Sequence, residues 1–141
     1  MRNVTLTINA TQFIDDDNRD TFELITDGKY SYEKGLGVLK YSESAITGME
    51  GTETTISASP TRVVLTREGT INTTMPFEQG HKQICVYETP MGAMTINIAT
   101  LKAKTGLGKN GGSLELEYTL GQNGDMAGRN SISIRVTPSV R

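Results

Sequence analysis

The chain has 141 residues and a net charge of −2, which is the length of one domain with enough surface to bury a real core. Charges of both signs are interspersed, so the basic surface of a nucleic-acid-binding protein is absent, and no apolar run is long enough to span a membrane. The single cysteine excludes an intramolecular disulfide, and no apolar signal segment precedes the first strand, so we expect a cytoplasmic protein.

Apolar and polar residues alternate along almost the whole chain, which is typical of strands with one buried and one wet face. No stretch has a convincing helical period. Turn residues such as Glu68-Gly69 and Pro90-Met91-Gly92 separate the alternating segments, and Asp27-Gly28 predicts a kink, so some neighbouring segments can form one bent strand. The pattern predicts strands at residues 2–9, 20–27, 29–34, 37–44, 51–58, 61–67, 70–77, 82–88, 92–104, 112–120 and 130–136.

Short connections favour antiparallel pairing of strands that are neighbours in the sequence. An open sheet of so many strands would expose two edges, and closing it into a barrel removes them. A sandwich is the alternative, but it usually needs long crossovers that this sequence lacks. We therefore predict one all-β domain over residues 1–141, an antiparallel up-and-down β-barrel of about eight to ten strands.

Two segments match ligand-binding motifs only in part. Residues 16–27 place Asp or Asn at several ligand positions of a calcium loop, but Thr21 stands where that loop requires Gly, so we interpret the segment as a hairpin turn. Residues 106–111 fit the G-x-G-x-x-G dinucleotide fingerprint, but a strand follows where the fingerprint requires a helix. We interpret this second segment as a mobile loop.

The residues suited to catalysis are few. His81 is the only histidine, which excludes a histidine-rich metal site and leaves one residue for any triad. Cys85 lies within a strand, where a small buried hydrophobe is the more common role. The inward face of this strand stays open, with Ile84 and Val86 or Cys85 and Tyr87 as the two sets. We expect no catalytic residue, no metal and no cofactor.

Three polar residues share a face with apolar neighbours. Tyr41 and Glu43 have the parity of Leu39, and Arg67 has the parity of Leu65, so all three should face the barrel interior. A charge that faces a core needs a partner. We favour a Glu43–Arg67 salt bridge that closes one barrel end, and the alternative is a polar cluster that faces a ligand. The expected lumen lining is Thr52, Thr54, Met75, Phe77, Tyr87, Met94 and Tyr118.

A series of short motifs resembles one protein family. They are Tyr41-Ser42-Glu43, Gly51-Thr52, Arg67-Glu68-Gly69, Met75-Pro76-Phe77, Tyr87-Glu88-Thr89-Pro90-Met91-Gly92 and the alternating run 112–118. Their serial order resembles the YwiB-like family of small proteins, mainly from Gram-positive bacteria. The resemblance implies a calycin-like β-barrel, the shape of lipocalins, fatty-acid-binding proteins and avidins. It implies no established activity, so it assigns no catalytic residue.

We expect this barrel to bind a small molecule in its interior or at its mouth, without catalysis. Barrels near eight strands are just wide enough for either their own side chains or one small ligand. The alternative is a protein–protein interaction module whose barrel is filled by its own side chains, and an enzyme ranks third because fold alone does not decide activity. The expected partner is a small molecule rather than a nucleic acid or a membrane. The sequence identifies neither the ligand nor the oligomeric state.

Overall fold

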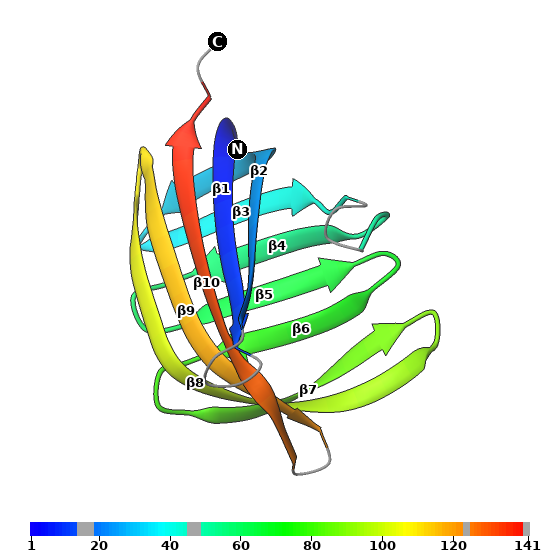
Figure 1. Ribbon diagram of the computed structural model, residues 1–141. Helices are drawn as coiled ribbons and strands as arrows, with labels where there is room; N and C mark the ends of the chain where they lie inside the picture. The colour runs from blue at the N-terminus through cyan, green and yellow to red at the C-terminus, as the bar shows by residue number, and fades with distance from the viewer. Residues whose placement is uncertain (14–18, 45–48, 123–124, 140–141) are drawn as a thin grey trace.

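The structure is a computed structural model that describes residues 1–13, 19–44, 49–122 and 125–139 (Figure 1). Within these ranges the regular structure is entirely β, and buried and exposed side chains alternate along the strands as the period of two predicts. The strands are β1 (Arg2–Phe13), β2 (Arg19–Glu33), β3 (Leu36–Ser42), β4 (Glu53–Ala58), β5 (Val63–Glu68), β6 (Asn72–Phe77), β7 (Lys82–Thr89), β8 (Gly92–Gly108), β9 (Gly111–Gln122) and β10 (Asp125–Pro138).

The ten strands form a closed antiparallel barrel in which each strand lies beside its neighbours in the sequence. Pairing of β1 with β10, from Val4 opposite Pro138 to Phe13 opposite Arg129, completes the closure. The predicted all-β, up-and-down barrel of about eight to ten strands is therefore confirmed. The predicted segments 20–27 and 29–34 form one strand, which is the alternative that the sequence left open, because β2 continues through Gly28, which stays paired with Val4.

Antiparallel order places alternate connections at opposite ends of the barrel. We call one end the terminal end, because it holds the two chain termini (Figure 1). The β2–β3, β4–β5, β6–β7 and β8–β9 turns also lie at this end. The other end, here the pocket end, holds the remaining connections. At the terminal end the Tyr30 hydroxyl donates a 2.6 Å hydrogen bond to the Gly108 carbonyl oxygen. Because β2 and β8 are not neighbours in the sheet, this bond crosses the interior.

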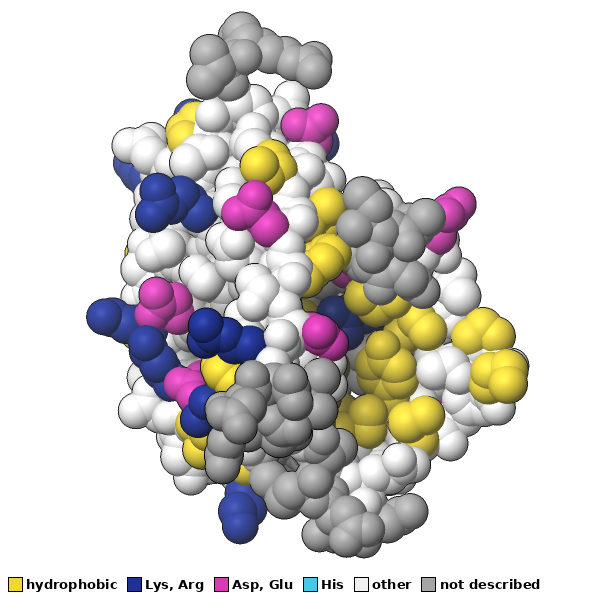
Figure 2. Space-filling view, in the orientation of Figure 1, with side chains coloured by type: hydrophobic (Ala, Val, Ile, Leu, Met, Phe, Trp, Pro, Cys, Tyr) yellow, Lys and Arg dark blue, Asp and Glu magenta, His cyan; other side chains and the backbone are white. Residues whose placement is uncertain are grey.

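The inward face of β7 consists of Cys85, which is buried, and Tyr87, which is half-buried. Ile84 and Val86 point outward, and the Ile84 side chain is 71 % exposed. Figure 2 shows hydrophobic side chains gathered on the side of the molecule where β7 and the β7–β8 turn lie. Of the two inward sets that the sequence left open for this strand, Cys85 and Tyr87 are therefore the one that faces inward.

Residues 106–111 are not a loop, so that expectation is wrong. They form the last residues of β8, the short turn at Lys109 and Asn110, and the first residue of β9. Gly112, at φ +136°, follows this turn, and a Cβ there would overlap the Gly106 carbonyl oxygen. The glycines therefore permit two strands to approach closely in a hairpin, and no helix N-terminus is present to hold a phosphate.

The calcium-like segment gives no metal site among the described residues. Asp16 and Asn18 lie outside the described residues, whereas Asp20 and Asp27 are both on β2. No group of three or more His, Cys, Asp or Glu side chains suited to a metal ion occurs in the described parts of the chain. The same described parts contain no helix of the length and hydrophobicity needed to cross a membrane.

Removing the Tyr30 hydroxyl tests the cross-barrel bond. Tyr30→Phe should lower the free energy of unfolding by about 1–3 kcal/mol, because the Gly108 carbonyl loses a buried donor. Urea unfolding measures this, with an unchanged m-value expected. Tyr32→Phe is the control, since it removes the same phenolic hydroxyl from a half-buried position two residues further along β2. Equal losses of unfolding free energy in the two variants would show that the Tyr30–Gly108 hydrogen bond does not stabilise the fold.

Candidate functional site

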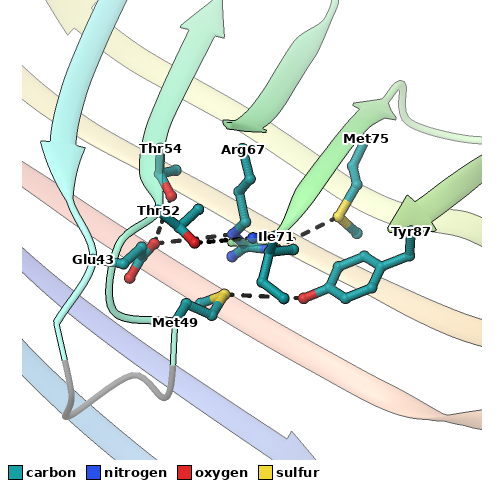
Figure 3. A network of polar contacts seen from close by, with 8 residues as sticks. All are labelled: Glu43, Met49, Thr52, Thr54, Arg67, Ile71, Met75 and Tyr87. Atoms are coloured by element: carbon teal, nitrogen blue, oxygen red, sulfur yellow. Dashed lines mark hydrogen bonds and ion pairs between the residues drawn. The ribbon is translucent and has the colours of Figure 1, made fainter. Parts of the chain in front are cut away.

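The polar cluster at the pocket end is held by the backbone of β3, β4 and β5. Glu43 follows β3, and its N–H donates to the Thr52 carbonyl oxygen at 2.8 Å, which extends the β3–β4 pairing past the strand ends. The Glu43 side chain therefore keeps the inward parity of Tyr41. Arg67, near the end of β5, lies opposite Thr54 of β4. These pairings direct Glu43 and Arg67 toward each other (Figure 3).

The Glu43–Arg67 pair is buried but only partly satisfied. Glu43 Oε1 accepts a 2.6 Å hydrogen bond from the Thr54 hydroxyl and lies 3.9 Å from Arg67 Nε. The Glu43 side chain is 1 % exposed and the Arg67 side chain 15 %. Among the described residues, Glu43 Oε2 and Arg67 Nε have no hydrogen-bond partner. Such atoms are rare in buried positions and call for an explanation.

Two tyrosines near this pair carry no charge at neutral pH. Burial raises the pKa of the Tyr41 phenol far above its ordinary value, and the charge of Glu43 raises it further, while Arg67 lowers it. Burial also raises the pKa of Tyr118, against a smaller lowering by Arg67. The cluster thus combines one carboxyl group and one guanidinium group with two neutral phenols.

A pocket of about 220 Å³ adjoins the pair. Tyr41, Glu43 and Arg67 form its polar side. Its apolar side consists of residues from β1, β2, β10 and the β3–β4 connection, namely Ile8, Ala10, Phe22, Leu24, Ile132 and Met49. The pocket therefore offers a buried acceptor and a buried donor beside an apolar surface.

The barrel wall beside this pocket is split. β2 pairs with β3 only over Lys29–Glu33, so its Arg19–Gly28 segment is paired with β1 alone. A groove of about 660 Å³ lies where the split begins and is lined in part by Asp27, Gly28 and Ser42, and also by Asn3 and Ser139 near the chain termini. Tyr41 lines both this groove and the inner pocket. The split thus lies between the pocket and the outer surface.

The segment from Met49 to Thr52 is tied to the β5–β6 turn. The Ile71 N–H donates to Thr52 Oγ1 and the Thr70 hydroxyl donates to the Glu50 carbonyl oxygen, both at 3.1 Å. The Tyr87 hydroxyl contacts Met49 Sδ at 3.9 Å (Figure 3). These contacts hold Met49 against the pocket.

Comparison with known proteins shows which family this chain belongs to. Residues 6–134 match a family described as a domain of unknown function, DUF1934. The chain belongs to this family. It is also similar to the crystal structure of the YwiB protein from Bacillus subtilis, with 20 % identity and a TM-score of 0.85 over 99 % of this chain and 93 % of that chain. At this identity the likeness shows the fold, in agreement with the expected YwiB-like family. No curated protein matches the chain.

In this DUF1934 barrel, the three residues of the predicted polar cluster come together, and none of the seven predicted lumen residues is among those that line the pocket beside them. Thr52 and Thr54 are buried and hydrogen bonded to the β5–β6 turn and to Glu43. Met75 and Phe77 are buried in the core, and Tyr118 packs on Phe77 with a ring distance of 4.8 Å. Tyr87 is half-buried, and Met94, beside the β7–β8 turn, is 39 % exposed.

The apolar lining of the pocket was missed by the sequence reasoning. Alternation at residues 4–10 and 22–24 gives the inward parity of the β1 and β2 members, and could have found them. Met49 lies outside any strand, so no periodic signal marks it. To predict the apolar lining, one would also need to know which strands pack against the polar cluster across the interior.

The histidine and the cysteine are not arranged as a catalytic pair. His81 is exposed, with Nε2 3.5 Å from Glu78 Oε1. Cys85 is buried, and burial raises the pKa of its thiol, which lowers the amount of reactive thiolate. Cys85 therefore fits the role of a small buried hydrophobe.

Breaking the buried pair should be costly. Arg67→Met should lower the free energy of unfolding by about 3–5 kcal/mol, because Glu43 would remain buried without a charged partner. Adding Glu43→Gln should recover part of that loss, which a double-mutant cycle in urea measures. A strictly additive cycle would contradict the pair.

The exposed Lys40–Glu53 pair, at 3.6 Å across β3 and β4, is the matched control. Lys40→Met and Glu53→Gln should each cost about 1 kcal/mol or less, because solvent screens this pair. Losses as large as those at Glu43 and Arg67 would show that burial is not the cause.

Alkaline pH should destabilise the protein through Tyr41. Its pKa is raised in the folded state, so the folded protein holds this proton more tightly than the unfolded chain does. The contribution of this proton to the free energy of unfolding is complete below the ordinary tyrosine pKa of about 10. It is lost as pH rises toward the raised pKa of the folded state. Tyr41→Phe should therefore lose less stability than wild type between pH about 9 and about 11 in urea unfolding. An unchanged pH slope would contradict this.

Proposed function

We propose that this protein binds a small molecule, without catalysing a reaction, in the pocket beside Glu43 and Arg67. One observation carries the proposal: Glu43 Oε2, on a side chain that is 1 % exposed, has no hydrogen-bond partner among the described residues and belongs to a residue that lines the pocket. A ligand that donates a hydrogen bond would supply the missing partner once the Glu43 carboxyl group, whose Oε2 has almost no exposed surface, turns toward the pocket. The pocket location and chemistry support binding, and the family offers no competing activity.

The energetic argument compares the cluster with a purely structural salt bridge. A buried polar group without a partner costs free energy, and a structural bridge is stable only when hydrogen bonds satisfy its remaining atoms. Here Thr54 satisfies one carboxyl oxygen, and the nearest guanidinium nitrogen lies beyond hydrogen-bond distance at 3.9 Å. The arrangement therefore suits a ligand that completes it better than a bridge that merely closes the barrel.

The pocket volume bounds the ligand size. A cavity of about 150 Å³ holds benzene, and pockets for drug-sized ligands measure about 300–1,000 Å³. The volume of about 220 Å³ lies between these values. A single ring with a short polar substituent fits this range.

The cytoplasm is the proposed location, supported by a single cysteine that is buried as a free thiol. The alternative role, a protein–protein interaction module, requires a barrel filled by its own side chains. That role would be favoured by a failure of the binding test that follows.

Filling the pocket should abolish binding. A screen of single-ring compounds should find a ligand that binds wild type at one to one, seen by native mass spectrometry. At a concentration of 100 times its dissociation constant it should stabilise the fold by about 2.7 kcal/mol, or about 5–10 °C in melting temperature. Ala10→Leu places a larger side chain at a position that lines the pocket, so binding should be lost while the fold stays stable.

The control is Thr11→Leu, which adds an apolar side chain at the next, outward position of β1. This variant should bind like wild type. If no compound binds, or if Ala10→Leu binds as well as wild type does, the proposed function is wrong for this pocket.

A further inference from the structure

The charges around the pocket balance. Glu43 supplies the carboxyl group and Arg67 the guanidinium group, and Tyr41 stays neutral because its phenol is buried. The remaining lining, from Ile8 to Ile132, is apolar. A ligand in this pocket therefore meets two opposite charges that are 3.9 Å apart and no net charge.

The two unpartnered atoms are complementary. Glu43 Oε2 accepts a hydrogen bond, and Arg67 Nε donates one. Neither atom has appreciable exposed surface in the barrel as it stands, so a ligand must shift these two side chains to reach them, and a single ligand edge that then meets both carries a donor next to an acceptor. The N–H and C=O groups of an amide are such an edge.

A charged head group would satisfy one partner and oppose the other. A carboxylate ligand suits Arg67 but faces the Glu43 carboxyl group, and an amidinium ligand suits Glu43 but faces the Arg67 guanidinium group. At these distances attraction and repulsion are of similar size, so the desolvation of the ligand's charge is left uncompensated. A purely apolar ligand leaves both buried atoms without partners.

We infer that the pocket selects uncharged, single-ring molecules with an amide-type donor–acceptor edge, and that it discriminates against carboxylates and amidines of the same shape. This inference rests on the proposed function and names the ligand class of the same pocket. Fatty acids, the ligands of some barrels of similar shape, are thereby disfavoured on two grounds: their negative charge and their length relative to about 220 Å³.

Four compounds of nearly equal shape test the inference: benzamide, benzoate, benzamidine and toluene. Isothermal titration with wild type at neutral pH should give the tightest binding for benzamide, by about tenfold or more over each of the others. Glu43→Gln removes the acid and keeps the side-chain shape. In this variant benzoate should gain about tenfold or more relative to benzamide, because Arg67 is then unopposed.

Stronger binding of benzoate, benzamidine or toluene than of benzamide to wild type would overturn the inference and leave the proposed function standing. An unchanged benzoate-to-benzamide ratio in Glu43→Gln would also overturn it, because Glu43 would not be the source of the discrimination. If none of the four binds, the ligand class is wrong. The single-ring screen with Ala10→Leu then decides separately whether the pocket binds any small molecule.

Discussion

Pairing of β1 with β10 is the contact on which the rest of the barrel depends. It joins the two ends of the chain through ten register pairs and leaves neither strand with a long free edge. It also has the largest sequence separation of any pairing in the sheet, so its loop-closure entropy is the largest. The pocket takes Ile8 from β1 and Ile132 from β10. Its apolar side therefore exists only when the barrel is closed.

The two ends of the barrel differ in how completely their buried polar groups are hydrogen bonded. At the terminal end, the Tyr30 hydroxyl and the Gly108 carbonyl satisfy each other across the interior. At the pocket end, the Glu43 carboxyl group shares one oxygen between Thr54 and Arg67 and leaves the other unpartnered. Departures from full satisfaction are expected at functional sites, where stability is given up for a task. This difference is why the pocket end, rather than the terminal end, is the candidate site.

Local alternation predicted most of the fold and the inward direction of Tyr41, Glu43 and Arg67, because the period of two is a property of each strand alone. It failed where the outcome depends on a partner strand. It missed the hairpin at residues 106–111, which follows from pairing of β8 with β9, and it left open the continuity of β2 through Gly28, which follows from pairing with β1. The apolar pocket lining depends on which strands meet across the interior, and Met49 is placed by contacts with the β5–β6 turn and Tyr87.

The split between β2 and β3 is a gap in the hydrogen-bonded wall of the barrel. Residues Arg19–Gly28 are held by a ladder on one side only, so they can swing outward without breaking a hydrogen bond to β3. Such an opening costs less free energy than unfolding the barrel, since the pairing that closes it stays intact. In the proposed function, a ligand would then reach the pocket through the wall between β2 and β3.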